Sequence, residues 1–204
     1  MTEPQAAASP RPSTVIDAIA EEWLDTELEL FPENHVYLGR PGREGEYADY
    51  SPDGSERAVA EVRKTLSKIS SAIPTDAVDE VTRTDLMRDL QLSIDKHDAG
   101  FDQRELNVIA SPAQGLRDIF DLMPTATEED WSVVATRLHN LPAAMDGYIQ
   151  TLRTGIASGN VPAIRQVQEI ITQVRKQAAD TGFFAQLASG AKADEGELPA
   201  SLMN

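Results

Sequence analysis

Apolar residues recur at spacings of three and four along most of the chain, and this spacing places them on one face of an α-helix. The clearest series predicts a helix over residues 55–73, whose apolar face is formed by Val59, Val62, Leu66, Ile69 and Ile73. A second series predicts a helix over residues 15–31, with an apolar face of Ile16, Ile19, Trp23, Leu24, Leu28 and Phe31. Similar series predict helices over residues 75–100, 112–123, 127–141, 142–159 and 162–182. In the first of these the apolar face is formed by Leu86, Leu90, Ile94, His97 and Phe101, and in the last by Ile164, Val167, Ile171, Val174 and Ala178.

Residues that begin or end helices flank these segments. Ser13 or Thr14 can cap the first helix through a side-chain oxygen, and Pro32 ends it. Ser55 is suited to cap the next helix, Thr127 with Asp130 resembles a capping box, and Pro142 is suited to the first turn of a later helix. No segment has a convincing strand pattern, and the unequal intervals argue against a helical repeat. We therefore predict an all-α fold, an irregular array of about seven helices.

One long segment, residues 32–54, interrupts the helical pattern with seven prolines and glycines. We expect a loop there, and a connection of more than about 20 residues is usually either functional or mobile. The candidate functional residues of this loop are His35, Tyr37, Tyr47 and Tyr50. Two interpretations stay open. In the first, the tyrosines bury their rings against the helices and leave their hydroxyls exposed to water. In the second, the loop faces a substrate.

The two ends of the chain differ in composition from the helical region. Residues 1–12 are rich in Ala, Pro and Ser, which is typical of a disordered tail. Residues 189–204 are small and acidic, like a linker. We therefore expect one helical domain over residues 13–188.

Composition excludes several classes of function. The chain has no cysteine, which removes disulfides, thiolate zinc sites and cysteine nucleophiles. Its net charge of −16 repels nucleic acids and anionic membrane surfaces, so we expect neither as a partner. No secretory signal and no apolar run of about 18 residues is visible in the sequence. We therefore expect a cytoplasmic location, and the oligomeric state stays open.

The few candidates for chemistry are weak. Asp95 and Asp98 share a helix face, but His97 between them lies on the apolar face, where a packed and hydrogen-bonded histidine is the commoner case. Glu33 and His35 could perform acid–base work if the loop aimed them together, but nothing else marks the pair, so we expect both to lie in a solvated loop. No G-x-S-x-G or phosphate-loop motif occurs. We predict no catalytic residue and no metal site within this chain.

Six short segments occur in an order that is typical of one bacterial family. They are Pro32–Gly39 (PENHVYLG), Asn107–Pro112 (NVIASP), Phe120–Pro124 (FDLMP), Glu129–Trp131 (EDW), Arg137–Pro142 (RLHNLP) and Tyr148–Gly155 (YIQTLRTG). Together they resemble the N-terminal part of the family called domain of unknown function 885, over roughly residues 13–182.

The resemblance implies that this chain is related to an enzyme but carries none of its catalytic residues. Members of the family are similar to zinc metallopeptidases of the gluzincin kind, whose H-E-x-x-H helix lies well downstream of this region. No position of this sequence matches those zinc ligands. The resemblance therefore implies a fragment, a truncated form or a degenerate member, with zinc expected only in a full-length relative.

Two functional hypotheses follow. In the first, the chain is the helical N-terminal portion of a zinc-dependent hydrolase acting on peptides. It then forms one wall of a cleft, and its partner is the C-terminal catalytic portion of the same family fold. In the second, the chain is a standalone helical interaction module, which predicts a cooperatively melting protein without a large exposed apolar patch.

Overall fold

The structure, a computed structural model, describes residues 11–192. Over that range the chain forms eight α-helices, two 3-10 helices and no strand, which confirms the predicted all-α class. The α-helices are α1 (Val15–Leu30), α2 (Glu33–Leu38), α3 (Pro52–Ser71), α4 (Ala77–Asp98), α5 (Pro112–Asp118), α6 (Glu128–Ser158), α7 (Ile164–Gln177) and α8 (Phe183–Ser189). The 3-10 helices are η1 (Asp102–Arg104), before α5, and η2 (Ile119–Leu122), after it.

Parts of both predicted tails lie outside the described residues. These parts are residues 1–10 of the N-terminal tail and residues 193–204 of the linker-like tail. Among the helices that the structure describes, none combines the length and the apolar character that crossing a lipid bilayer requires.

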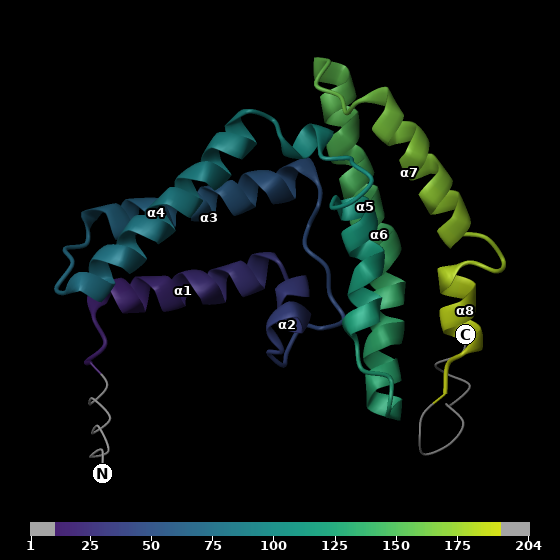
Figure 1. Ribbon diagram of the computed structural model, residues 1–204, viewed down its shortest axis with the longest axis horizontal. Helices are drawn as coiled ribbons and strands as arrows, with labels where there is room; N and C mark the ends of the chain where they lie inside the picture. Colours follow the sequence, from purple (N-terminus) through teal and green to yellow (C-terminus); the bar gives the residue numbers. More distant parts are fainter. Residues whose placement is uncertain (1–10, 193–204) are drawn as a thin grey trace, which may run out of the picture.

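Helices α1, α3 and α4 form one layer, and they lie side by side in Figure 1. The apolar faces predicted from the sequence meet in a single buried cluster, which contains Ile16, Val59, Val62, Ile69, Leu90 and Ile94. Ile16 and Ile69 have no exposed surface. Burial of such side chains stabilises each by about 1.5–3 kcal/mol, so this cluster is the main reason the layer forms.

The second half of the chain packs around α6, the long helix that runs across the ends of this layer in Figure 1. One buried cluster joins η2 to the first half of α6 and contains Ile119, Phe120, Met123, Trp131 and Val134. The ring of Phe120 contacts those of Phe183 and Phe184, which attaches α8. A smaller cluster of Ala113, Tyr148 and Ile170 joins α5, α6 and α7.

The structure corrects the predicted break at Pro142, because α6 runs through it as one helix. A proline inside a helix costs about 3 kcal/mol through one lost hydrogen bond and a steric clash. Here the helix is held on both sides of the proline by buried residues, Val134 and Arg137 before it and Ala144 and Tyr148 after it. Packing therefore outweighs the local preference.

The predicted loop over residues 32–54 is shorter in the structure. Helix α2 occupies Glu33–Leu38 and ends at Gly39, whose φ of 61° is the left-handed conformation that favours glycine. Helix α3 begins at Pro52, because the side chain of Ser51 accepts a hydrogen bond from the N–H of Gly54. The prediction that Ser55 caps α3 is therefore wrong, and Ser55 points its hydroxyl away from the helix end.

Close backbone contact joins η1 to the last part of α6. Gly155 of α6 faces the carbonyl oxygens of Gln103 and Asn160, and a Cβ atom at this position would collide with both. The side chain of Asn160 also donates to the carbonyl of Gly100 at 2.7 Å. The absence of a side chain at Gly155 therefore sets how closely η1 approaches α6.

We expect Gly155→Ala to lower the free energy of unfolding by about 1–3 kcal/mol, because η1 must move away from α6. Gly115→Ala is the matched control, since Gly115 lies in α5 with open space around it. Alanine is the better helix former, so the control should raise stability by up to about 1 kcal/mol. Urea unfolding of both variants checks the sign, and equal effects would contradict this close contact.

Candidate functional site

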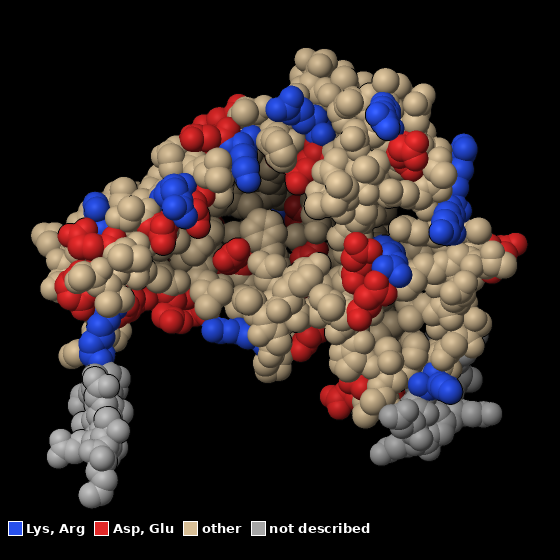
Figure 2. Space-filling view, in the orientation of Figure 1, with Lys and Arg blue, Asp and Glu red and all other residues tan. Residues whose placement is uncertain are grey.

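A cavity of about 580 Å³ opens between the layer of α1, α3 and α4 and the helix α6. Its walls come from the C-terminal ends of α1 and α4, from α3, from residues 43–51 and from two residues of α6. Figure 2 shows the hollow in the middle of the molecule, with acidic side chains in and around it. A cavity of this size is in the range that binds small ligands or parts of larger ones.

Aromatic side chains are concentrated at this cavity. The chain has 2 Trp, 4 Tyr and 5 Phe, and six of these line the cavity: Trp23, Phe31, Tyr47, Tyr50, Phe101 and Tyr148. Aromatic rings offer apolar contact area, and their faces attract cations. The walls are therefore suited to a ligand that is partly apolar.

Glu33 fixes the wall formed by residues 43–51. Its carboxylate is buried and accepts hydrogen bonds from the N–H of Ala48 at 3.1 Å and from the hydroxyl of Tyr50 at 2.8 Å. The sequence predicted Glu33 to lie in a solvated loop, and that prediction is wrong. The reason is long-range: its partners are 15 and 17 residues away, and no local pattern pairs them.

Arg137 holds the same wall from the other side. The side chain has no exposed surface, its Nε–H donates to the carbonyl of Glu44 at 2.6 Å, and its guanidinium lies 4.8 Å from the ring centroid of Tyr47. Nearby, Asn140 donates to the carbonyl of Gly45 at 3.0 Å. Two residues one turn apart on α6 thus hold the backbone at residues 44–45.

The four candidate loop residues divide into two pairs. Tyr47 and Tyr50 line the cavity, and the hydroxyl of Tyr47 donates to the carbonyl of Leu116 at 2.8 Å. His35 and Tyr37 lie on α2 and are not among the lining residues. The His35 ring packs beside Gly42, and Tyr37 is more than half exposed. That His35, Tyr37, Tyr47 and Tyr50 face a substrate stays a prediction.

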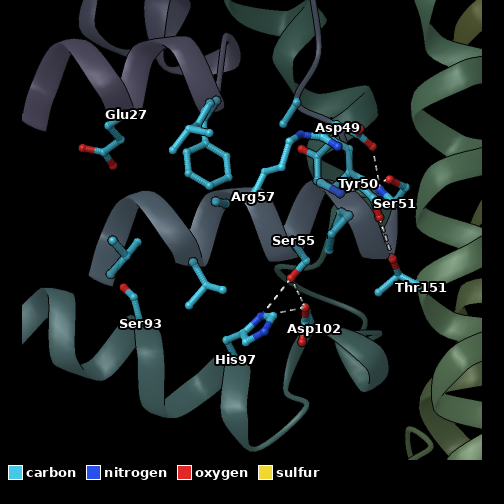
Figure 3. Close-up of a pocket in the computed structure, with 18 of the residues that line it drawn as sticks. Glu27, Asp49, Tyr50, Ser51, Ser55, Arg57, Ser93, His97, Asp102 and Thr151 are labelled. Carbon is cyan, nitrogen blue, oxygen red and sulfur yellow. Dashed lines mark hydrogen bonds and ion pairs between the residues drawn. The ribbon is translucent and has the colours of Figure 1, made fainter. Parts of the chain in front are cut away.

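A polar cluster lies where α3, α4 and η1 meet (Figure 3). The hydroxyl of Ser55 lies 3.1 Å from Nδ1 of His97 and donates to Oδ2 of Asp102. In addition, Nε2 of His97 lies 3.3 Å from a carboxylate oxygen of Glu56. Oδ1 of Asp102 is buried and has no partner among the described residues.

This cluster does not have the geometry of a catalytic triad. A triad needs the imidazole between the serine and the carboxylate, so that one nitrogen is oriented while the other takes the proton. Here the serine hydroxyl lies between His97 and Asp102, and these two are 3.8 Å apart. The cluster instead connects α3 to α4 and η1, in keeping with the expectation that His97 is a hydrogen-bonded packing residue. The sequence did not link Ser55 and Asp102 to it.

Two further carboxylates of the cavity have shifted pKa values. Burial raises the pKa of Glu27 on α1 and that of Glu105 after η1 above the ordinary value. Lys96 lowers the pKa of Glu105 in part, and Asp102 raises it. Within residues 11–192, no hydrogen-bond donor or basic side chain pairs with the carboxylate of Glu27. It is therefore a half-buried acid without a counter-charge.

The zinc that the resemblance implies finds no matching set of ligands in the part of the chain that the structure describes. There, no three His, Asp or Glu side chains come together in a way that could hold a metal ion. The three histidines lie on three different helices, as His35 on α2, His97 on α4 and His139 on α6. The described residues thus do not fit a zinc site, and no step through zinc is assigned to them.

Comparison with known families gives one result. The family model described as "Bacterial protein of unknown function (DUF885)" matches residues 32–203, which is most of the chain and confirms the resemblance seen in the sequence. The matched region contains every wall of the cavity except α1. No curated protein matches the chain.

We expect Glu33→Ala to lower the free energy of unfolding by about 2–3 kcal/mol, because the N–H of Ala48 and the hydroxyl of Tyr50 lose a charged acceptor. Glu29→Ala is the control, since this carboxylate is exposed and should change stability by less than about 0.5 kcal/mol. Chemical denaturation measures both, and a loss at Glu33 no larger than at Glu29 would contradict the buried anchor.

The four tyrosines should also resist ionisation. Burial raises the pKa of Tyr47 and Tyr148 to about 12, and it raises those of Tyr37 and Tyr50 as well. The folded state therefore keeps protons that the unfolded state releases near pH 10, so the contribution of Tyr47 and Tyr148 to stability is lost as pH rises from about 10 to about 12. Tyrosinate absorbance in native and urea-unfolded protein tests this, and coincident titration curves would refute it.

Proposed function

This chain belongs to the DUF885 family, and we propose that it is the helical, non-catalytic portion of a zinc-dependent hydrolase that acts on peptides. In this role it forms one wall of the substrate cleft. The observation that carries the proposal is the cavity between α3, α4, α6 and residues 43–51, because four buried or half-buried polar contacts hold it open in a defined shape.

The cavity has the composition of a binding wall. Six aromatic side chains and the apolar residues of α3 supply contact area, while Ser51, Ser55 and several carboxylates supply polar groups. An extended peptide presents alternating apolar side chains and backbone amides, and both kinds of group find partners on such a surface. The residues of this chain would hold and orient a substrate and keep water from it, while the reacting groups come from elsewhere in the family fold.

A second surface, on α7, is suited to binding a partner. The apolar stripe predicted for α7 is not covered by the described chain: Ile164, Ile171 and Val174 are exposed, and Ile170 is the residue that α7 buries. Exposed apolar stripes of this kind mark interaction surfaces. We propose that the catalytic portion of the same family fold packs against this stripe of α7.

The alternative is a standalone interaction module, and one observation favours it. The three apolar clusters are each closed within residues 11–192, so the folded core does not need another part of the family fold. The exposed stripe of α7 counts against it, because a self-contained module is expected to leave no large apolar patch exposed. The two functions differ in the size and metal content of the native protein.

The proposed function is tested on the native protein, recovered from the source organism with an antibody raised against this chain. We expect a species several times larger than 22.2 kDa that contains zinc and hydrolyses peptides. A species near 22.2 kDa would overturn the proposal and favour the interaction module.

The purified 204-residue chain is the control for the assignment of roles. We expect it to hydrolyse no peptide and to take up no stoichiometric zinc, since its described residues gather no ligand set. Tight binding of one zinc ion per chain would contradict a non-catalytic wall. Equilibrium dialysis followed by elemental analysis gives the zinc content directly.

A further inference from the structure

We propose that Glu27, which follows Trp23 and precedes Phe31 by four residues each, binds an ammonium group carried on an apolar body. The inference rests on the proposed function, because it names the chemical class of ligand that the α1 side of the same cavity accepts. Trp23 and Glu27 lie on α1, and Phe31 is the residue directly after it. Each is four residues from the next, so the three share one side of the helix, and all three line the cavity.

The charge of Glu27 is not compensated within the described chain. The two arginines of the cavity are already engaged: Arg43 pairs with Glu46, and Arg57 pairs with Asp49. The third base, Lys96, affects the pKa of Glu105 and lies over the ring of Phe101. A half-buried carboxylate without a cation is unfavourable, and a bound cation would remove that cost.

The neighbours of Glu27 favour an organic cation over a metal ion. Trp23 and Phe31 lie about one helical turn before and after Glu27 and line the same cavity, and aromatic faces attract ammonium and guanidinium groups. Opposite them, Ala58, Val59 and Val62 of α3 line the same cavity with apolar surface. A metal ion would need several oxygen or nitrogen ligands, and these residues supply none.

Figure 3 shows the carboxylate of Glu27 directed from α1 toward α3, on the cavity side of the helix. It lies away from the cluster of Ser55, His97 and Asp102, which is on the other side of α3 in this view. The proposed ammonium site is therefore separate from that cluster. In a peptide, either the amino terminus or a lysine side chain carries such a group.

The experiment measures binding of small probes to the 204-residue chain by the indole N–H signals in a nitrogen–proton correlation spectrum. The chain has two tryptophans, and Trp23 lines the cavity while Trp131 lies in the core beside η2. Trp23→Phe assigns the two signals. The probes are phenylalaninamide, which has a free amino terminus, N-acetyl-lysinamide, which has a side-chain ammonium, and the neutral N-acetylphenylalaninamide.

We expect at least one cationic probe to shift the Trp23 signal with a Kd in the millimolar range, which is typical of a single small contact, and to leave Trp131 unchanged. The cation that binds identifies the source of the ammonium group. Glu27→Gln should weaken this binding by about tenfold or more, because it keeps the shape and removes the charge. Glu21→Gln, an exposed acid on the same helix, should leave it unchanged.

Folding is checked separately. Glu27 has no partner among the described residues, so Glu27→Gln should melt at the same or a higher temperature than the unsubstituted chain. The proposal is overturned if neither cation shifts Trp23, if the neutral probe shifts it equally, or if Glu27→Gln binds with unchanged affinity. None of these results would touch the proposed function, which depends on the size, zinc and activity of the native protein.

Discussion

Two buried charges, Glu33 and Arg137, hold residues 43–51 in the place on which the cavity depends. The carboxylate of Glu33 accepts from the backbone and side chain of residues 48–50, and the guanidinium of Arg137 donates to the carbonyl of Glu44. A buried charge is costly unless hydrogen bonds replace its water. Glu33 meets this condition, while Arg137 meets it in part: its two terminal nitrogens are buried with no partner among the described residues, and its guanidinium lies over the ring of Tyr47. Because these bonds are directional, they fix the position of residues 43–51, which connect α2 to α3. The cavity is thus the space between the apolar layer of α1, α3 and α4 and residues 43–51, which hydrogen bonds hold in place.

The residues that line the cavity show the same division between apolar and polar groups. Apolar residues of α3 and six aromatic rings line it together with five acids, which are Glu27 and Glu29 of α1, Asp49, and Asp102 and Glu105 after α4. The chain as a whole is strongly acidic, with a net charge of −16. A negative surface raises the local concentration of cations around it. Both the charge of the whole molecule and the carboxylate of Glu27 therefore favour ligands that carry a positive charge.

The exposed stripe of α7 gives the molecule a second, different face. The stripe predicted to be the buried side of α7 contains Ile164, Val167, Ile171 and Val174, yet three of these four side chains are exposed. The sequence pattern correctly indicates an apolar face but does not identify what covers it. In the proposed function, the catalytic portion of the family fold covers the stripe while the cavity receives the substrate. One helical array would then serve both assembly and binding.

The sequence alone determined what depends on neighbours three or four residues away. The apolar faces of α1, α3 and α4, and the threonines Thr14 and Thr127 that cap α1 and α6, were all predicted, because helix spacing and caps are local. The order of short segments also identified the family. Only the tertiary structure decided that α6 continues through Pro142, since burial on both sides outweighs the local cost of a proline. It alone brought Glu33 to Ala48 and Arg137 to Glu44, and it alone left Glu27 half-buried without a partner within residues 11–192. These are contacts between residues far apart in the chain, or the lack of them, and no periodicity of the sequence encodes them.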